Sequence, residues 1–345
     1  MKFELDCSLG EGGGSIVRIS VALAAATRFS LKLVNIRAKR SNPGLRTQHI
    51  EAINAIQQLS GISVRGSKIG SQILTIEPEK QGANSASVNI STAGSVALVA
   101  QAVMFYSIPQ KQTFTLSVKG GATHGKWAPS IDYIKNVTHS LLRKMNKSIE
   151  VRVDQCGFFP QGGSNCHFTF AEHQSLNSLN LIERGSLEKI DIYSTASKNL
   201  ENRKVAERQV KGFVDKIKPI VDTISHVDYV NSVCPGTGLT IVNEYSSGTK
   251  MGCFVPGERK ISAEYVGELC SKKWKEIENS SASVDQYAAD QLIIPLSLIE
   301  ENSVISTNTI TNHTRTNIEL AKKFTQANIR INKRPRCYII EIKTN

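Results

Sequence analysis

The sequence predicts a mixed α/β (α+β) protein built from three βαβαββ repeats, with a smaller α/β domain inserted into the third repeat. Two observations predict this fold. The order strand, helix, strand, helix, strand, strand occurs twice near the N-terminus, in copies roughly 80 residues apart. A segment bounded by two Ser/Asn-rich joints then interrupts the pattern, which resumes near the C-terminus.

The first repeat begins with an alternating polar and apolar segment, and an alanine-rich helix follows it. Its expected strands are 2–7 and 30–38, its helices 16–26 and 47–60, and its closing hairpin 62–64 with 72–76. The second repeat has the same order, with strands 87–90 and 113–119, helices 96–106 and 129–145, and a hairpin of 148–153 with 164–170.

The insert lies between joints at 174–184 and 279–283. It is expected to contain a strand at 187–194, helices 202–217 and 261–276, and a hairpin of 240–244 with 252–255. The third repeat supplies helices 284–299 and 314–327, a strand at 303–306 and a hairpin of 329–332 with 338–343. Its opening strand is missing, so the insert is expected to split this repeat. The predicted domains are therefore 1–184 with 279–345, and 185–278.

The composition favours a polyanionic partner. The 42 Lys and Arg exceed the 30 Asp and Glu, which gives a net charge of +12 and favours nucleic acid, although such a charge also serves solubility alone. The seven cysteines form no C-x-x-C pair, the N-terminus is charged, and no apolar run is long enough to span a membrane. We expect a cytoplasmic protein with reduced thiols and no membrane partner; the sequence leaves the oligomeric state open.

The segment 9–18 is a glycine-rich loop that runs into a helix. Four glycines within five residues allow a tight turn with exposed N–H groups, and the helix directs its positive end to the same place. This arrangement predicts an anion site. Glu11 offers a carboxylate for a metal or a sugar, and Arg18 a guanidinium for phosphate. The alternative is a turn whose glycines only permit close packing.

A second cluster places four cations in the ten residues 37–46, on the loop after a strand. Arg37 and Arg40, with Arg18, are expected to converge on a triphosphate or on RNA phosphate. The alternative is a solvated rim of charges. The uncharged pair Gln48 and His49 at the start of the next helix favours a site.

His313 is the candidate nucleophile. It lies where the loop of the third repeat meets its second helix, the place that the glycine and cation loops occupy in the other repeats. A neutral imidazole nitrogen can attack phosphorus and form a phosphoramidate of high energy. The alternative is a surface histidine that only forms hydrogen bonds.

Other nucleotide motifs are excluded. The segment 120–127 nearly matches the P-loop pattern, but Trp127 stands where the pattern requires a hydroxyl for Mg²⁺. The first loop carries no G-x-G-x-x-G because position 15 is serine, and the chain contains no H-E-x-x-H.

Taken together, these motifs resemble the RNA 3′-terminal phosphate cyclase family. The resemblance runs in family order from residue 10 to residue 317. It is carried by segments 10–14 with Arg18, 36–40 with 43–49, 93–95 with Gln101, 128–129, 157–160 with 162–163, 257–258 with 262–264, 289–292, and His313 with 316–317.

The resemblance implies a three-repeat catalytic core like that of the enolpyruvyl transferases. It also implies ATP-dependent conversion of an RNA 3′-phosphate to a 2′,3′-cyclic phosphate with Mg²⁺ or Mn²⁺. In that reaction His313 becomes a covalent histidyl-AMP, the adenylate passes to the RNA 3′-phosphate, and the 2′-hydroxyl expels AMP. A phosphate monoester dianion is a poor electrophile until AMP activates it.

The resemblance also implies roles for individual residues. The metal or nucleotide site would include Glu11. The phosphates would be bound by Arg18, Arg37, Arg40 and Gln48, and the nucleotide or RNA end would lie near Gln101 and Pro129. The adenine would be flanked by Phe254 and Tyr287, and His313 would be surrounded by Asp290 and Gln291. Asp290 is the candidate to orient the imidazole.

The chain departs from the family pattern at Ser164, which replaces a third glycine, and in the loop 120–127. These departures leave the details of RNA contact open. Two alternative functions are weighed: a non-catalytic cyclase-like protein that binds RNA or assists ribosome assembly, and an enolpyruvyl transferase. Non-catalytic cyclase-like proteins lack the nucleophilic histidine. Enolpyruvyl transferases lack both the histidine and the cation-rich loops.

Overall fold

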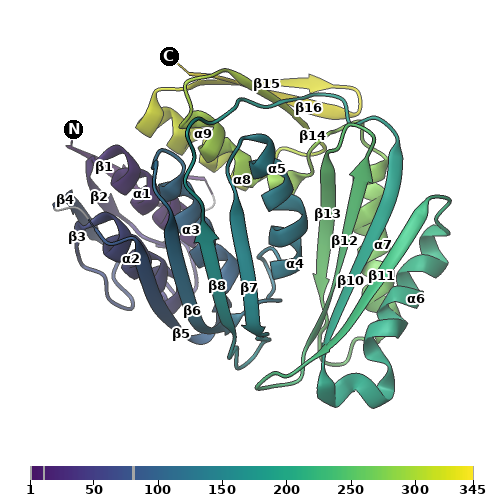
Figure 1. Cartoon of the computed structure of the whole chain (residues 1–345). Helices are drawn as coiled ribbons and strands as arrows, with labels where there is room; N and C mark the ends of the chain where they lie inside the picture. The colour runs from purple at the N-terminus through teal and green to yellow at the C-terminus, as the bar shows by residue number, and fades with distance from the viewer. Residues whose placement is uncertain (1, 11, 80–81, 345) are drawn as a thin grey trace.

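The computed structural model describes residues 2–10, 12–79 and 82–344 (Figure 1). Three of its four-stranded sheets share one topology, with strand orders β1-β2-β4-β3, β5-β6-β8-β7 and β9-β14-β16-β15. In each sheet the first two strands are parallel and the remaining pairings are antiparallel. The predicted three-repeat α/β fold is therefore confirmed.

The first two repeats follow the predicted order closely. The first contains β1 Lys2–Asp6, α1 Gly14–Thr27, β2 Ser30–Val34, α2 Thr47–Ser60, β3 Ile62–Arg65 and β4 Leu74–Pro78. The second contains β5 Ser85–Ser95, α3 Val96–Ser107, β6 Phe114–Ala122, α4 Ile131–Tyr133, the π-helical turn η1 Ile134–Thr138, α5 His139–Lys144, β7 Ile149–Gln155 and β8 Asn165–Phe170.

The third repeat contains the opening strand that the sequence did not reveal. β9, Asn180–Leu181, pairs in parallel with β14, Ser303–Thr307, inside the segment expected to be only a linker. Two residues are too few for an alternating pattern to be recognised. The repeat continues with α8 Gln286–Ser297, α9 Asn312–Thr325, β15 Asn328–Arg334 and β16 Cys337–Lys343. The inserted segment thus separates β9 from the rest of its repeat.

The inserted segment forms a fourth sheet of order β11-β10-β12-β13. Its elements are β10 Leu187–Ser197, the 3₁₀ turn η2 Lys198–Arg203, α6 Val205–Ile217, β11 Asp222–Val230, β12 Thr237–Tyr245, β13 Lys250–Pro256 and α7 Ala263–Glu278. The sequence analysis missed β11 because this edge strand buries little of its surface and carries no clear alternation.

Packing places the helices inside the three-repeat body. α1 contacts α2, α3 and α9, so helices of all three repeats meet, with the sheets outside them (Figure 1). The fourth sheet packs α6 and α7 on one face and contacts α4 and η1 with the other. The hydrophobic core around the fourth sheet also contains Cys337 and Ile339 from β16. The domain limits 184/185 and 278/279 stay a prediction.

Candidate functional site

The glycine-rich loop lies against the N-terminal half of α9. Gly10 has a φ of +56°, and a Cβ atom added there would lie 2.3 Å from Thr316 Oγ1. Thr316 is one helical turn after His313, and its hydroxyl donates to the carbonyl of Asn312 (2.8 Å). The first and third repeats therefore meet where the sequence analysis placed an anion site and a nucleophile. Glu11 lies outside the described residues.

His313 is an exposed residue in the first turn of α9, which begins at Asn312 instead of after the histidine. Asp290 of α8 fixes this turn, because its Oδ1 accepts from the hydroxyls of Thr311 (2.8 Å) and Thr314 (2.5 Å). The helix N-terminus carries partial positive charge, which favours an anion beside His313. Asp290 thus acts on the backbone that carries the imidazole.

His49 is buried against the start of α1. A Cβ atom at Gly14 would lie 1.9 Å from His49 Nε2, so only glycine fits there. The ring accepts the Arg46 N–H at Nδ1 (3.0 Å), which leaves Nε2 as the donor in the neutral tautomer. Burial, with the charges of Arg18 and two further arginines, lowers the pKa of His49 to about 3. The ring therefore remains uncharged.

Arg18 is a buried cation with an unsatisfied donor. Its side chain is 6% exposed, its Nε has no hydrogen-bond partner among the described residues, and burial lowers its pKa to about 10. The pKa of Arg37 is also lowered, first by burial and then by Arg46 and Arg40. A cluster of mutually repelling guanidiniums fits bound phosphate oxygens, since an anion would offset both the desolvation and the repulsion.

Arg37 and Arg40 differ in position. The Nη1 of Arg37 donates to the carbonyls of Asn42 (2.7 Å) and Gly44 (2.9 Å), so this side chain also holds its own loop in shape. Arg40 is exposed on the same loop. The charges of Arg18, Arg37 and Arg46 act on His49, and the charge of Arg40 acts on Arg37.

Gln48 joins this cluster to the second repeat. Its Oε1 accepts the backbone N–H of Ser95 (3.1 Å), the N-cap of α3, and its side chain packs on Gly94. The carbonyl of Gly94 would in turn lie 2.7 Å from a Cβ atom at Gly121. The first two repeats therefore touch through Gln48, and within the second repeat Gly94 and Gly121 pack too closely to admit a side chain at Gly121. Gln101 of α3 is half-buried.

Phe254 of β13 lies where the fourth sheet meets the loop 120–128. Its ring lies 6.0 Å from that of His124, which stacks on Phe158 at 5.4 Å. The Nε2 of His124 lies 2.9 Å from Asp132 Oδ2. The sequence analysis missed His124 and Asp132; the first lies inside the rejected P-loop match, and the second three residues after the half-buried Pro129.

Tyr287 lies at the start of α8, where Lys273 of α7 donates to its hydroxyl (2.8 Å). The buried N-cap Asp285 connects this helix to β13, because its Oδ2 accepts the N–H of Gly252 (2.9 Å). Phe254 and Tyr287 thus lie on two elements joined by Asp285. The described residues show no direct contact between these two rings.

Gln291 is the predicted site residue with the clearest structural role. It is buried, its Nε2 donates to the carbonyl of Tyr287 (3.1 Å), and its Oε1 accepts from Thr138 (3.1 Å). Its amide therefore joins α8 to η1.

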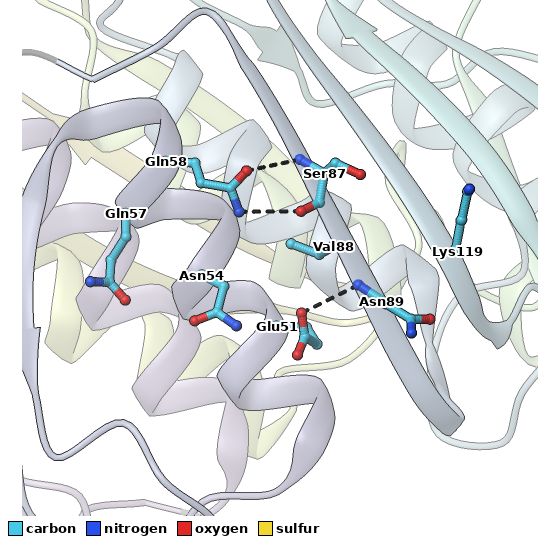
Figure 2. Close-up of a pocket in the computed structure, with 8 residues that line it drawn as sticks. All are labelled: Glu51, Asn54, Gln57, Gln58, Ser87, Val88, Asn89 and Lys119. Carbon is cyan, nitrogen blue, oxygen red and sulfur yellow. Dashed lines mark hydrogen bonds between the residues drawn. The ribbon is translucent and has the colours of Figure 1, made fainter.

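A polar groove of about 450 Å³ lies between α2 and β5 and is shown in Figure 2. Gln58 binds both the N–H (3.0 Å) and the carbonyl (3.2 Å) of Ser87, and Glu51 accepts from the N–H of Asn89 (3.3 Å). β5 is an edge strand, so these side chains satisfy its free backbone groups. None of the predicted site residues lines this groove, and we assign it a structural role.

The described residues contain no cluster of three or more His, Cys, Asp or Glu that could hold a metal ion. None of their helices is long and apolar enough to cross a membrane. All seven cysteines are free and buried.

The fold defines a three-repeat α/β protein in which the glycine-rich loop of the first repeat meets the N-terminal half of α9 from the third. The family model for RNA 3′-terminal phosphate cyclase matches residues 9–331. The chain belongs to the RNA 3′-terminal phosphate cyclase family.

Three curated relatives, each named RNA 3′-terminal phosphate cyclase, match over nearly their whole length. The protein of Methanococcoides burtonii is 35% identical over 336 residues (96% of this chain, 97% of the relative). That of Staphylothermus marinus is 33% identical over 330 residues (93% and 91%). That of Nostoc punctiforme is 30% identical over 356 residues (99% and 99%).

Proposed function

We propose that this chain is an enzyme that uses ATP to convert an RNA 3′-terminal phosphate to a 2′,3′-cyclic phosphate. The observation that carries the proposal is the contact between Gly10 of the glycine-rich loop and Thr316, one helical turn after His313, together with the buried Arg18, whose Nε has no hydrogen-bond partner among the described residues. This arrangement places a nucleophile next to groups that favour phosphate.

In the first step, the neutral imidazole of His313 attacks the α-phosphorus of ATP. A P–N bond forms, the bond between the α-phosphorus and the bridging oxygen breaks, and pyrophosphate leaves. The positive end of α9 and the guanidiniums of Arg18, Arg37 and Arg40 stabilise the charge on the phosphate oxygens. Asp290 holds the turn that aims the ring.

In the second step, an oxygen of the RNA 3′-phosphate attacks the same phosphorus and the P–N bond breaks. The RNA then ends in a pyrophosphate-linked AMP. The 2′-hydroxyl attacks the terminal RNA phosphorus, loses its proton, and expels AMP. Each displacement thus exchanges one bond at phosphorus for another, and ATP supplies the driving force.

Other parts of the proposal concern groups that lie around this centre. Glu11 would bind Mg²⁺ or Mn²⁺, which would neutralise phosphate charge. The nucleotide or the RNA end would lie next to Gln48, Gln101 and Pro129. The adenine would lie between Phe254 and Tyr287. Gln291 would act by holding α8 in place. The free thiols agree with action in the cytoplasm.

The test is to incubate the protein with α-labelled ATP and either metal, denature it, and measure label retained on the polypeptide. We expect acid-labile label on the wild type and none on His313→Ala. His167→Ala is the matched control, because His167 lies on β8 and bonds Asp154 (3.0 Å). Absence of label from a folded wild type that binds ATP would contradict the proposal and favour a non-catalytic RNA-binding protein.

A further inference from the structure

Trp127 is an indole almost fully surrounded by solvent. Its side chain is 96% exposed, and its backbone φ of +57° lies in a region that bulky side chains rarely adopt. Such strain is found preferentially where a function requires it. Large aromatic rings normally bury their surface, so a fully exposed tryptophan indicates a contact with something outside the chain.

The loop that carries Trp127 is held firmly. The N–H and hydroxyl of Thr123 exchange hydrogen bonds with Gly157 (2.9–3.2 Å), and His124 points inward to Phe158 and Phe254. Lys126 forms an ion pair with Glu258 (2.5 Å), which ties the loop to the segment after β13. These contacts therefore hold the backbone on either side of Trp127 in place.

A second exposed ring lies on the adjoining loop. Phe159 follows Gly157 by two residues and is 74% exposed. Both loops are bound to each other through Thr123 and Gly157, and the first packs on Gly94, next to the contact between Gln48 and Ser95. Two exposed aromatic side chains therefore stand on loops that are bonded to each other, and the first loop is connected through Gly94 to Gln48, a residue predicted to contact the phosphates.

We propose that Trp127, with Phe159 on the adjoining loop, is a stacking surface for an unpaired base near the 3′ end of the RNA substrate. This inference rests on the proposed function. Base stacking on aromatic rings is the usual way in which proteins hold single-stranded RNA, and it tolerates any sequence. The net charge of +12 favours a polyanionic partner such as an RNA backbone.

The first experiment measures cyclisation of a short single-stranded RNA with a 3′-phosphate. Trp127→Ala should raise the KM for RNA by about 5- to 150-fold while labelling from ATP stays at the wild-type level. Trp127→Phe should restore most of the loss because it keeps a ring. Phe159→Ala should add to the effect of Trp127→Ala. Tyr265→Ala is the control, since Tyr265 is an exposed ring on α7 and should not change the KM.

The second experiment identifies the base. Oligonucleotides with one abasic site at successive positions from the 3′ end are compared on wild type and Trp127→Ala. One position should weaken binding to the wild type and leave the variant unaffected. The chain contains two tryptophans, and Trp274 donates to Asn243 (2.8 Å), so quenching of exposed indole fluorescence by RNA should vanish in Trp127→Phe.

The outcomes separate the two proposals. If the wild type cyclises RNA and Trp127→Ala has the same KM for RNA as the wild type, the stacking proposal is wrong and the proposed function stands. If the wild type neither takes label from ATP nor cyclises RNA, the proposed function fails instead. A KM that rises equally for intact and abasic RNA at every position would also overturn the stacking surface.

Discussion

At the scale of single residues, the buried Arg18 yields a prediction about both stability and nucleotide binding. A buried guanidinium whose Nε has no hydrogen-bond partner among the described residues costs folding free energy, and a bound phosphate would offset that cost. We predict that Arg18→Met raises the free energy of unfolding of the ligand-free protein by about 1 kcal/mol and raises the KM for ATP at least about tenfold. Urea unfolding and initial rates measure the two effects. A variant that is both less stable and fully active would contradict this account.

His49 makes a separate prediction about pH. Its pKa is lowered to about 3 in the folded protein, whereas an unfolded histidine titrates near 6.5. Between these values the unfolded state binds the extra proton, so the contribution of His49 is fully present above about pH 6.5 and is lost as the pH falls toward 3.

The free energy of unfolding should therefore fall with decreasing pH in this window, with up to about 1.4 kcal/mol per pH unit from His49. In His49→Asn the amide oxygen can still accept the Arg46 N–H, and the slope should be shallower. Urea unfolding at several pH values tests this. Equal slopes in the wild type and in His49→Asn would mean that other groups cause the loss of stability at low pH.

At the scale of elements, the glycine loop depends on its contact with α9. Gly10→Ala would place a methyl group 2.3 Å from Thr316 Oγ1 and strain a φ of +56°. We expect a loss of about 1–2 kcal/mol in stability and a strong loss of labelling from ATP. Gly70→Ala is the matched control, because Gly70 also has a positive φ but no atom within 4 Å of the added methyl. Only Gly10→Ala should impair labelling.

The N-cap of α8 joins three parts of the molecule. Asp285 accepts from the Tyr133 hydroxyl (2.6 Å), the Gly252 N–H and two N–H groups of its own helix. Asp285→Ala should cost about 3 kcal/mol, because it leaves buried donors without partners. Ser262→Ala, at the N-cap of α7 with one bond to Tyr265, should cost about 1 kcal/mol. Thermal or urea unfolding compares them; equal losses would refute the connecting role.

At the scale of the whole molecule, the net charge of +12 predicts that RNA binding depends strongly on salt. If three or four phosphates are neutralised, the dissociation constant for single-stranded RNA should rise about 20- to 50-fold between 50 and 200 mM salt. Filter binding or fluorescence titration measures it. A dissociation constant that does not change with salt would show that the basic surface serves solubility alone.

The repeat architecture was predictable because each unit buries its own helix and sheet faces, and this burial leaves regular patterns in the sequence. β9 and β11 escaped prediction for a physical reason. A two-residue strand and a largely exposed edge strand are held by backbone hydrogen bonds to neighbours, and these bonds require no particular side chains.

The sequence by itself determined the three-repeat fold, the family, and the residue types suited to phosphate: glycines before a helix, clustered arginines, and His313. Only the tertiary structure decided which of these residues lie in contact with one another. It placed Thr316 against Gly10 and His49 against Gly14, gave Gln291 a structural role, and left Trp127 in solvent. These outcomes depend on contacts between residues that are far apart in the chain, from 35 positions for Gly14 and His49 to 306 for Gly10 and Thr316, and no local pattern in the sequence encodes the distance between such residues.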